Sequence, residues 1–110
     1  MLITLAALLF FHFLMDYPLQ GEFLSRAKNK FDPIPHVPWY HAMTAHSFLH
    51  AGAVYIVLGV WWIAALEFAA HFVIDYLKCK GELTLNQDQM LHLCCKIIWV
   101  VLAGVACTYM

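Results

Sequence analysis

Charged residues are scarce in this chain of 110 residues, because Asp, Glu, Lys and Arg make up only 12% of it. That is about half their share in a typical soluble domain. Seven acidic residues against six basic ones give a formal net charge of -1. The chain therefore lacks the basic excess that binding to nucleic acid requires. Its apolar composition and low net charge also exclude intrinsic disorder.

Cysteine is present, but without the spacing that would give it a chemical role. The four cysteines at positions 79, 94, 95 and 107 form no C-x-x-C pair, so neither a redox motif nor a thiolate metal site is predicted. We expect all four to be small buried apolar residues. All four prolines lie between residues 18 and 38, which leaves the rest of the chain free to form helices.

Apolar residues, in contrast, make up 64% of the chain, and its mean hydropathy is +0.73. A soluble domain of this size cannot bury so much apolar surface, so a membrane protein is predicted. Four apolar stretches cover residues 2–17, 41–58, 60–77 and 90–109. The first has no basic residue before it and no cleavage site after it, so it is expected to be a membrane helix rather than a removable signal. We predict one all-α domain over residues 1–110, a small membrane four-helix bundle.

An internal repeat predicts where the long apolar region between residues 41 and 77 turns. As one helix it would be about 55 Å long, nearly twice the hydrocarbon thickness of a bilayer. The sequence H-F-L-M-D-Y at residues 12–17 is echoed by H-F-V-I-D-Y at residues 71–76. Superposing the copies places Leu2 on Trp61 and predicts a tight turn just after Gly59, so that the bundle consists of two repeated helical hairpins. A competing interpretation has three spans, with residues 51–74 as a single helix.

The basic residues predict the orientation of the bundle. In the four-helix arrangement all six lie on one side: Arg26, Lys28, Lys30, Lys78, Lys80 and Lys96. The positive-inside rule makes that side cytoplasmic. We therefore predict a multi-pass protein of the bacterial inner membrane with both termini outside the cytoplasm.

Histidine is unusually frequent, with seven residues against six lysines and arginines combined. Residues four positions apart share one face of a helix. Four such pairs combine histidine with aspartate or with another histidine: His12 with Asp16, His46 with His50, His71 with Asp75, and Asp88 with His92. In an up-down-up-down bundle all four pairs are expected at one membrane face. Ionisable groups within membrane helices are costly and are normally paired and functional.

These residues predict a metal site. Its candidate ligands are five histidines and three aspartates: His12, Asp16, His46, His50, His71, Asp75, Asp88 and His92. The set offers nitrogen and oxygen but no sulfur, which suits zinc first, with manganese or iron as alternatives. Helical bundles commonly hold one or two ions between histidines and carboxylates of facing helices. Such ions activate a bound water, which is the apparatus for hydrolysing an ester or phosphoester.

Two further ionisable residues are candidates for a catalytic role. Glu67 lies one turn before His71 and is interpreted as a general base, as an anchor behind the ligands, or as a paired buried acid. Lys96 lies one turn after His92 and either contacts a substrate phosphate or extends to the headgroups. His36 is expected in a solvated loop, and His41 is at most an outer ligand.

The motifs H-F-L-M-D-Y-P-L-Q, the pair His46 and His50, H-F-V-I-D-Y-L-K and D-Q-M-L-H follow one another in this order. With them the chain resembles, over essentially its whole length, a family of small bacterial and bacteriophage membrane proteins known as domain of unknown function 3307. The resemblance implies the fold and the membrane location, but no particular reaction. More distantly, the pattern is similar to membrane-bound metal-dependent hydrolases, which implies hydrolysis.

Three functions remain open from the sequence. The first is a metal-dependent hydrolase of a lipid-linked ester or phosphoester. The second is a non-catalytic, phage-type membrane protein that modulates a host membrane complex, in which the polar residues hold the helices together. The third, a proton or metal conduit, is disfavoured because the outer halves of the helices lack ionisable residues. Expected partners are the bilayer, a lipid-linked substrate, a second copy of the chain or a host membrane protein.

Overall fold

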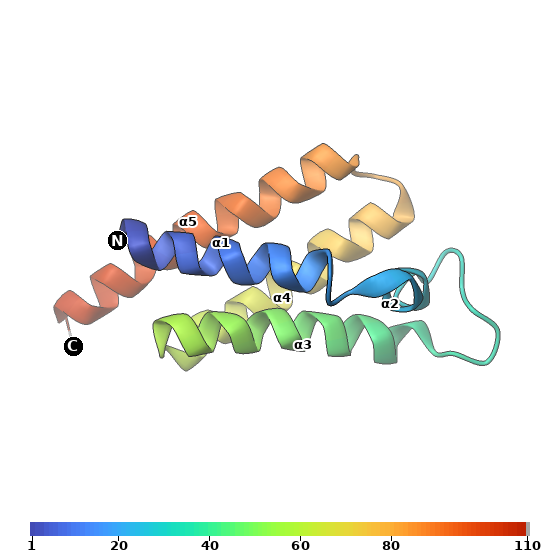
Figure 1. Cartoon of the computed structure of the whole chain (residues 1–110), viewed down its shortest axis with the longest axis horizontal. Coiled ribbons are helices and arrows are strands. Elements are labelled where there is room, and N and C mark those ends of the chain that lie inside the picture. The colour runs from blue at the N-terminus through green and yellow to red at the C-terminus, as the bar shows by residue number, and fades with distance from the viewer. Residues whose placement is uncertain (110) are drawn as a thin grey trace.

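The computed structural model describes residues 1–109, and within that range the chain folds into five helices. They are α1 (Leu2–Asp16), α2 (Gly21–Ala27), α3 (Trp39–Leu58), α4 (Trp61–Lys80) and α5 (Leu85–Tyr109) (Figure 1). The predicted all-α fold class is confirmed. The four long helices occupy the four apolar stretches, whereas the short helix α2 was not predicted.

The end of α1 has a local cause. Pro18 disfavours helical geometry in the residue before it, and Tyr17 leaves the helix with φ -111° and ψ -83°. The chain then bends by 84° into α2, which lies within the interval that was expected to be a loop. This bend carries α2 across the end of the long helices, where it contacts α3.

The turn between α3 and α4 lies where the sequence repeat placed it. Helix α3 ends at Gly59, whose φ of +70° is a left-handed conformation that glycine adopts without steric cost, and α4 begins two residues later at Trp61. The alternative prediction, a single helix over residues 51–74, is therefore wrong. The two helices of this hairpin pack against each other along their length.

The start of α5 differs most from the prediction. The backbone N–H of Thr84 donates to Gln87 Oε1 at 2.9 Å, and the N–H of Gln87 donates to Thr84 Oγ1 at 3.2 Å. This reciprocal capping begins the helix at Leu85, five residues before the predicted position 90. As a result Asp88 and His92 both lie on the first two turns of α5.

The long helices form a closed ring of neighbours, in which α1 contacts α3, α3 contacts α4, α4 contacts α5 and α5 contacts α1. Both termini and the α3–α4 turn lie at one end, and α2 and the α4–α5 loop lie at the other (Figure 1). The apolar core is on the terminal side of the candidate ligands and is built from Leu8, Val54, Ile63, Trp99 and Val100.

The distribution of polar and apolar residues is inverted relative to a soluble domain. Among the described residues, eleven polar or ionisable residues are buried against ten apolar ones, while large apolar side chains such as Phe48, Ile56 and Val105 are exposed. The expectation that all four cysteines are buried is wrong, because Cys79 and Cys95 are half-buried and Cys94 and Cys107 are exposed on α5. Both lie on the outward surface of a helix whose inner face is taken by Asp88, His92 and Trp99.

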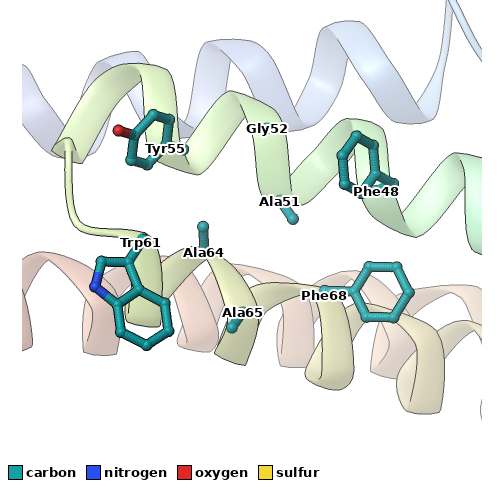
Figure 2. Close-up of a pocket in the computed structure, with 8 residues that line it drawn as sticks. All are labelled: Phe48, Ala51, Gly52, Tyr55, Trp61, Ala64, Ala65 and Phe68. Atoms are coloured by element: carbon teal, nitrogen blue, oxygen red, sulfur yellow. The ribbon is translucent and has the colours of Figure 1, made fainter.

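An apolar groove of about 580 Å³ runs between α3 and α4 on the outer surface. Its middle is formed by small residues, and aromatic rings flank them at both ends (Figure 2). The lining residues are Phe48, Ala51, Gly52, Tyr55, Trp61, Ala64, Ala65 and Phe68. The groove continues the apolar exterior over the α3–α4 hairpin.

One helix in the described part of the chain is long and apolar enough to cross a membrane by itself, α5 over Leu85–Thr108. Only 22% of the 18-residue apolar segment of this helix is buried inside the protein. Helices α1 and α2 meet the same criterion only if they are counted together as one bent span. Helix α3 carries His46 and His50 and α4 carries Glu67 and Asp75, which lowers the hydropathy of both. One of the four predicted spans therefore meets the criterion directly.

Candidate metal centre

Asp16, in the last turn of α1, is the centre of the first half of the cluster. Its Oδ1 accepts a hydrogen bond from His50 Nε2 at 2.9 Å and lies 3.2 Å from His46 Nε2. Its Oδ2 lies 3.4 Å from His12 Nε2, one turn earlier on the same helix. The i,i+4 spacing of His12 and Asp16 thus puts both side chains on one face of α1, where Asp16 reaches the histidines of α3.

Asp75, the equivalent residue of the second repeat, is the centre of the other half. Its Oδ1 accepts a hydrogen bond from His92 Nε2 of α5 at 3.0 Å. Its Oδ2 lies 3.3 Å from His46 Nε2 and 3.4 Å from His71 Nε2. The same oxygen accepts a hydrogen bond from Lys28 Nζ at 2.6 Å. Asp75 therefore joins α3, α4, α5 and the residue that follows α2.

Asp88 and Gln89 join the two halves. The amide nitrogen of Gln89 donates to Asp16 Oδ2 at 3.0 Å and to Asp88 Oδ2 at 3.1 Å, and its Oε1 accepts from His12 Nε2 at 3.0 Å. Asp88 Oδ1 lies 3.4 Å from His92 Nε2. Gln89 therefore connects Asp16 of α1 with Asp88 of α5.

All eight predicted ligands are buried at one level of the structure. Seven of them form three overlapping groups, and within each group the donor atoms lie within 4.8 Å of one another. The groups are Asp16, His46, His50 and His71; His71, Asp75 and His92; and Asp16, Asp88 and His92. His12 belongs to none of the three, and its Nε2 hydrogen bond to Gln89 places it at the edge of the cluster.

The donor geometry fits a bound cation. With metal–ligand bonds of about 2.0–2.2 Å, the donor atoms of a tetrahedral site stand roughly 3.4 Å apart and neighbouring donors of an octahedral site roughly 3 Å apart. The Nε2 atoms of His46 and His71 lie near two carboxylates each, yet neither makes a hydrogen bond, and Asp88 Oδ1 has no partner either. His12 Nδ1 and His71 Nδ1 are also without a hydrogen bond. Buried polar atoms are normally paired, so these atoms are available as donors to a cation.

A second polar network lies one turn deeper. Lys96 Nζ donates to Glu67 Oε1 at 2.6 Å, and the indole N–H of Trp99 donates to Glu67 Oε2. Glu67 Oε1 also lies 3.4 Å from His71 Nδ1. At this distance the carboxylate lies behind the imidazole ring but makes no hydrogen bond with Nδ1. Glu67 is thus a paired buried acid that lies behind His71.

Lys96 differs from both of its sequence-based interpretations. Its side chain is only 2% exposed and is held against Glu67, so it extends neither to the headgroups nor to a substrate phosphate. The reason is its position on α5, because the turn after His92 faces α4 and not the end of the helices. Neither Glu67 nor Lys96 lines the polar pocket at the mouth of the cluster, so the predicted catalytic contact of either with a substrate is not supported.

Lys28 is the site residue that sequence reasoning missed. It was counted with Arg26 and Lys30 as part of a cytoplasmic basic loop, and no motif marks it. The bend after α1 and the turn of α2 bring it onto Asp75 and Gln20. The remaining histidines lie elsewhere, since His36 and His41 are both exposed and outside the three groups.

The chain belongs to the family described as protein of unknown function DUF3307, which it matches over residues 4–109. The match covers every candidate ligand and all five helices apart from the first two residues of α1. No curated protein and no solved structure matches the chain.

Proposed function

Because the family has no assigned activity, the chemistry of the buried cluster is the guide, and we propose that this protein is a membrane-embedded metal-dependent hydrolase. Its substrate is a lipid-linked ester or phosphoester. The observation that carries the proposal is the convergence of five imidazoles and three carboxylates from four helices, with five of their buried nitrogen and oxygen atoms unpaired. Buried polar atoms of a structural hydrogen-bond network are normally paired, so this number of unpaired atoms in one cluster supports a bound cation.

The overlap of the donor groups supports a centre of two ions. Asp16 belongs to two of the three groups, and so do His71 and His92. A carboxylate has two oxygens, so Asp16 could bind both ions, whereas His71 and His92 would each bind one of them through Nε2. The absence of sulfur favours zinc, with manganese or iron as alternatives. Bound there, the ions would supply an activated water and a positive charge for the developing oxyanion.

In this proposal the chain's own residues hold and shield the reacting groups. Gln89 fixes Asp16 and Asp88 relative to each other through two hydrogen bonds, and Glu67 lies 3.4 Å behind the Nδ1 atom of His71. The apolar core below the cluster closes the terminal side. Hydrolysis consumes one water, whose hydroxyl joins the carbonyl carbon or the phosphorus while its proton passes to the leaving oxygen.

The membrane part of the proposal is a four-helix bundle of two repeated hairpins that crosses the bacterial inner membrane. It is supported by the apolar exterior, the buried polar interior and the apolar span of α5. In lipid this inverted distribution is favourable, because exposed apolar side chains face hydrocarbon and the ionisable groups are paired inside. The basic residues at the α2 end support a cytoplasmic location for that end.

The orientation predicts the behaviour of reporter fusions. Alkaline phosphatase fused after the C-terminus is expected to be active in intact cells, because that end lies outside the cytoplasm. The same enzyme inserted after Glu82, in the α4–α5 loop, is expected to be inactive, because the loop lies inside. A reporter that is active after Glu82 and inactive at the C-terminus would show the opposite orientation. Equal activity at both positions would show that α5 does not cross the membrane.

The reaction itself predicts metal-dependent turnover in detergent micelles. The zinc-loaded protein is expected to hydrolyse a chromogenic phosphomonoester or a short-chain lipid ester, and chelation is expected to abolish the rate. Asp16→Asn removes a charged donor shared by two groups, so its rate is expected to fall by at least about a hundredfold. His41→Ala is the matched control because His41 is exposed and outside the cluster. A metal-loaded protein without hydrolysis of either substrate class would refute the catalytic role.

One observation favours the second function, a non-catalytic membrane protein that modulates a host membrane complex. Asp16 and Asp75 each contact histidines of other helices, so together they connect all four long helices. Such contacts stabilise helix association in lipid without any reaction. In that case the substitutions above would weaken the fold, and no substrate would be turned over.

A further inference from the structure

A polar pocket of about 410 Å³ opens at the α2 end of the structure and reaches the cluster. It is lined by the carboxylates Asp16, Asp75 and Asp88 and by Lys28 and Lys78. At roughly 30 Å³ per water in the liquid, its volume corresponds to about fourteen waters. It can therefore hold a phosphate group together with the first atoms of the group attached to it.

Resting on the proposed metal centre, we propose that this pocket is a phosphate subsite in which Lys28 and Lys78 contact the phosphate of the substrate. The three carboxylates and two lysines of the pocket sum to a single negative charge. One divalent cation on the carboxylates reverses that sign, and a second increases it further. A pocket with excess positive charge at its inner end, lined by ammonium and amide donors, selects an anion over a neutral ester.

The position of Lys28 supports this choice. Its Nζ is held between Asp75 Oδ2 at 2.6 Å and Gln20 Oε1, and its side chain is only 11% exposed. Asp75 Oδ2 is also the oxygen that approaches His46 and His71. A cation that binds this oxygen competes with Lys28 for it. The displaced ammonium then remains in the pocket, next to the cation, with its donors available to a phosphate oxygen.

Phosphate binding to the detergent-solubilised, zinc-loaded protein tests the subsite, with bound zinc measured on the same samples. Inorganic phosphate and dihexanoyl phosphatidate are the two probes, titrated by calorimetry. Lys28→Met is expected to weaken binding of both by roughly tenfold to a hundredfold, because a charge-assisted hydrogen bond is lost. Lys78→Met is expected to weaken binding in the same direction. Lys80→Met is the control because Lys80 is exposed and does not line the pocket.

The outcomes separate the subsite from the metal centre. Full zinc content with no affinity for either probe overturns the subsite and leaves the metal centre intact. Zinc-loaded Lys28→Met and Lys78→Met that bind both probes as the parent does also overturn it. A parent that binds no zinc refutes the proposed function itself. If only inorganic phosphate binds, and the two lysine substitutions weaken that binding, the phosphate group comes from a soluble substrate. If phosphatidate binds more tightly than inorganic phosphate, the phosphate group belongs to a lipid headgroup.

Discussion

His71→Ala is expected to lose most of the metal that the parent protein binds. His71 is fully buried, belongs to two of the three donor groups and contributes an Nε2 atom that has no other partner. Loss of a residue that only hydrogen-bonds to a metal ligand lowers metal affinity by about 10- to 100-fold, and loss of a ligand itself is expected to cost more. Metal content per chain, measured by mass spectrometry after purification in detergent, checks this expectation. Asp16→Asn is expected to behave in the same way.

His41→Ala is the matched control for that experiment, because it removes the same side chain from an exposed position on α3. Its metal content is expected to equal that of the parent. His12→Ala gives a finer test, since His12 lies outside the three groups and is expected to lose less metal than His71→Ala. Metal that is sub-stoichiometric in the parent and unchanged in all of these variants would refute the metal centre.

The convergence of the ligands was predictable because two independent signals agree. The i,i+4 spacing gives each helix one polar face, and the H-F-x-x-D-Y repeat fixes the turn at Gly59, which brings the four faces to one level. Had residues 51–74 formed a single helix, His46 and His71 would lie far apart. The structure instead brings both within 3.4 Å of Asp75 Oδ2.

The parts that could not be predicted depend on contacts between segments distant in sequence. Lys28 reaches Asp75 only because Pro18 ends α1 and the chain bends by 84° into α2, and no periodicity encodes that bend. The early start of α5 follows from the cap between Thr84 and Gln87, which is readable in the sequence but lies outside the apolar stretch that was taken as the helix.

Lys96 shows a further limit of sequence reasoning. Lys96 lies four residues after His92, as His50 lies four residues after His46, so the two hairpins differ at this position. The sequence does not indicate what replaces the ligand there. In the structure Lys96 faces Glu67 of α4, and the aligned His50 faces Asp16 of α1. The second half of the repeat therefore uses this position for an ion pair behind the cluster, and the first half uses it for a candidate ligand.

This buried ion pair predicts a large loss of stability on removing one partner. Lys96→Met keeps most of the side-chain volume but leaves the Glu67 carboxylate without its cation, and both side chains are at most 2% exposed. Removing one partner of such a pair costs about 3–5 kcal/mol. The double substitution Lys96→Met with Glu67→Gln removes both charges and is expected to recover much of this loss. The free energy of unfolding in mixed micelles, measured by circular dichroism, checks both expectations.

Lys80→Met is the control for this pair, because Lys80 and Glu82 are 3.5 Å apart and about half exposed. An exposed pair contributes at most about 1 kcal/mol, so this variant is expected to unfold close to the parent. If Lys96→Met cannot be purified, the double variant still tests the explanation. Both variants lose the packing of the lysine side chain, but only the single variant leaves an uncompensated charge. A folded, stable double variant therefore shows that the charge, and not lost packing, destabilises Lys96→Met. A double variant less stable than either single variant would contradict the charge-pair account.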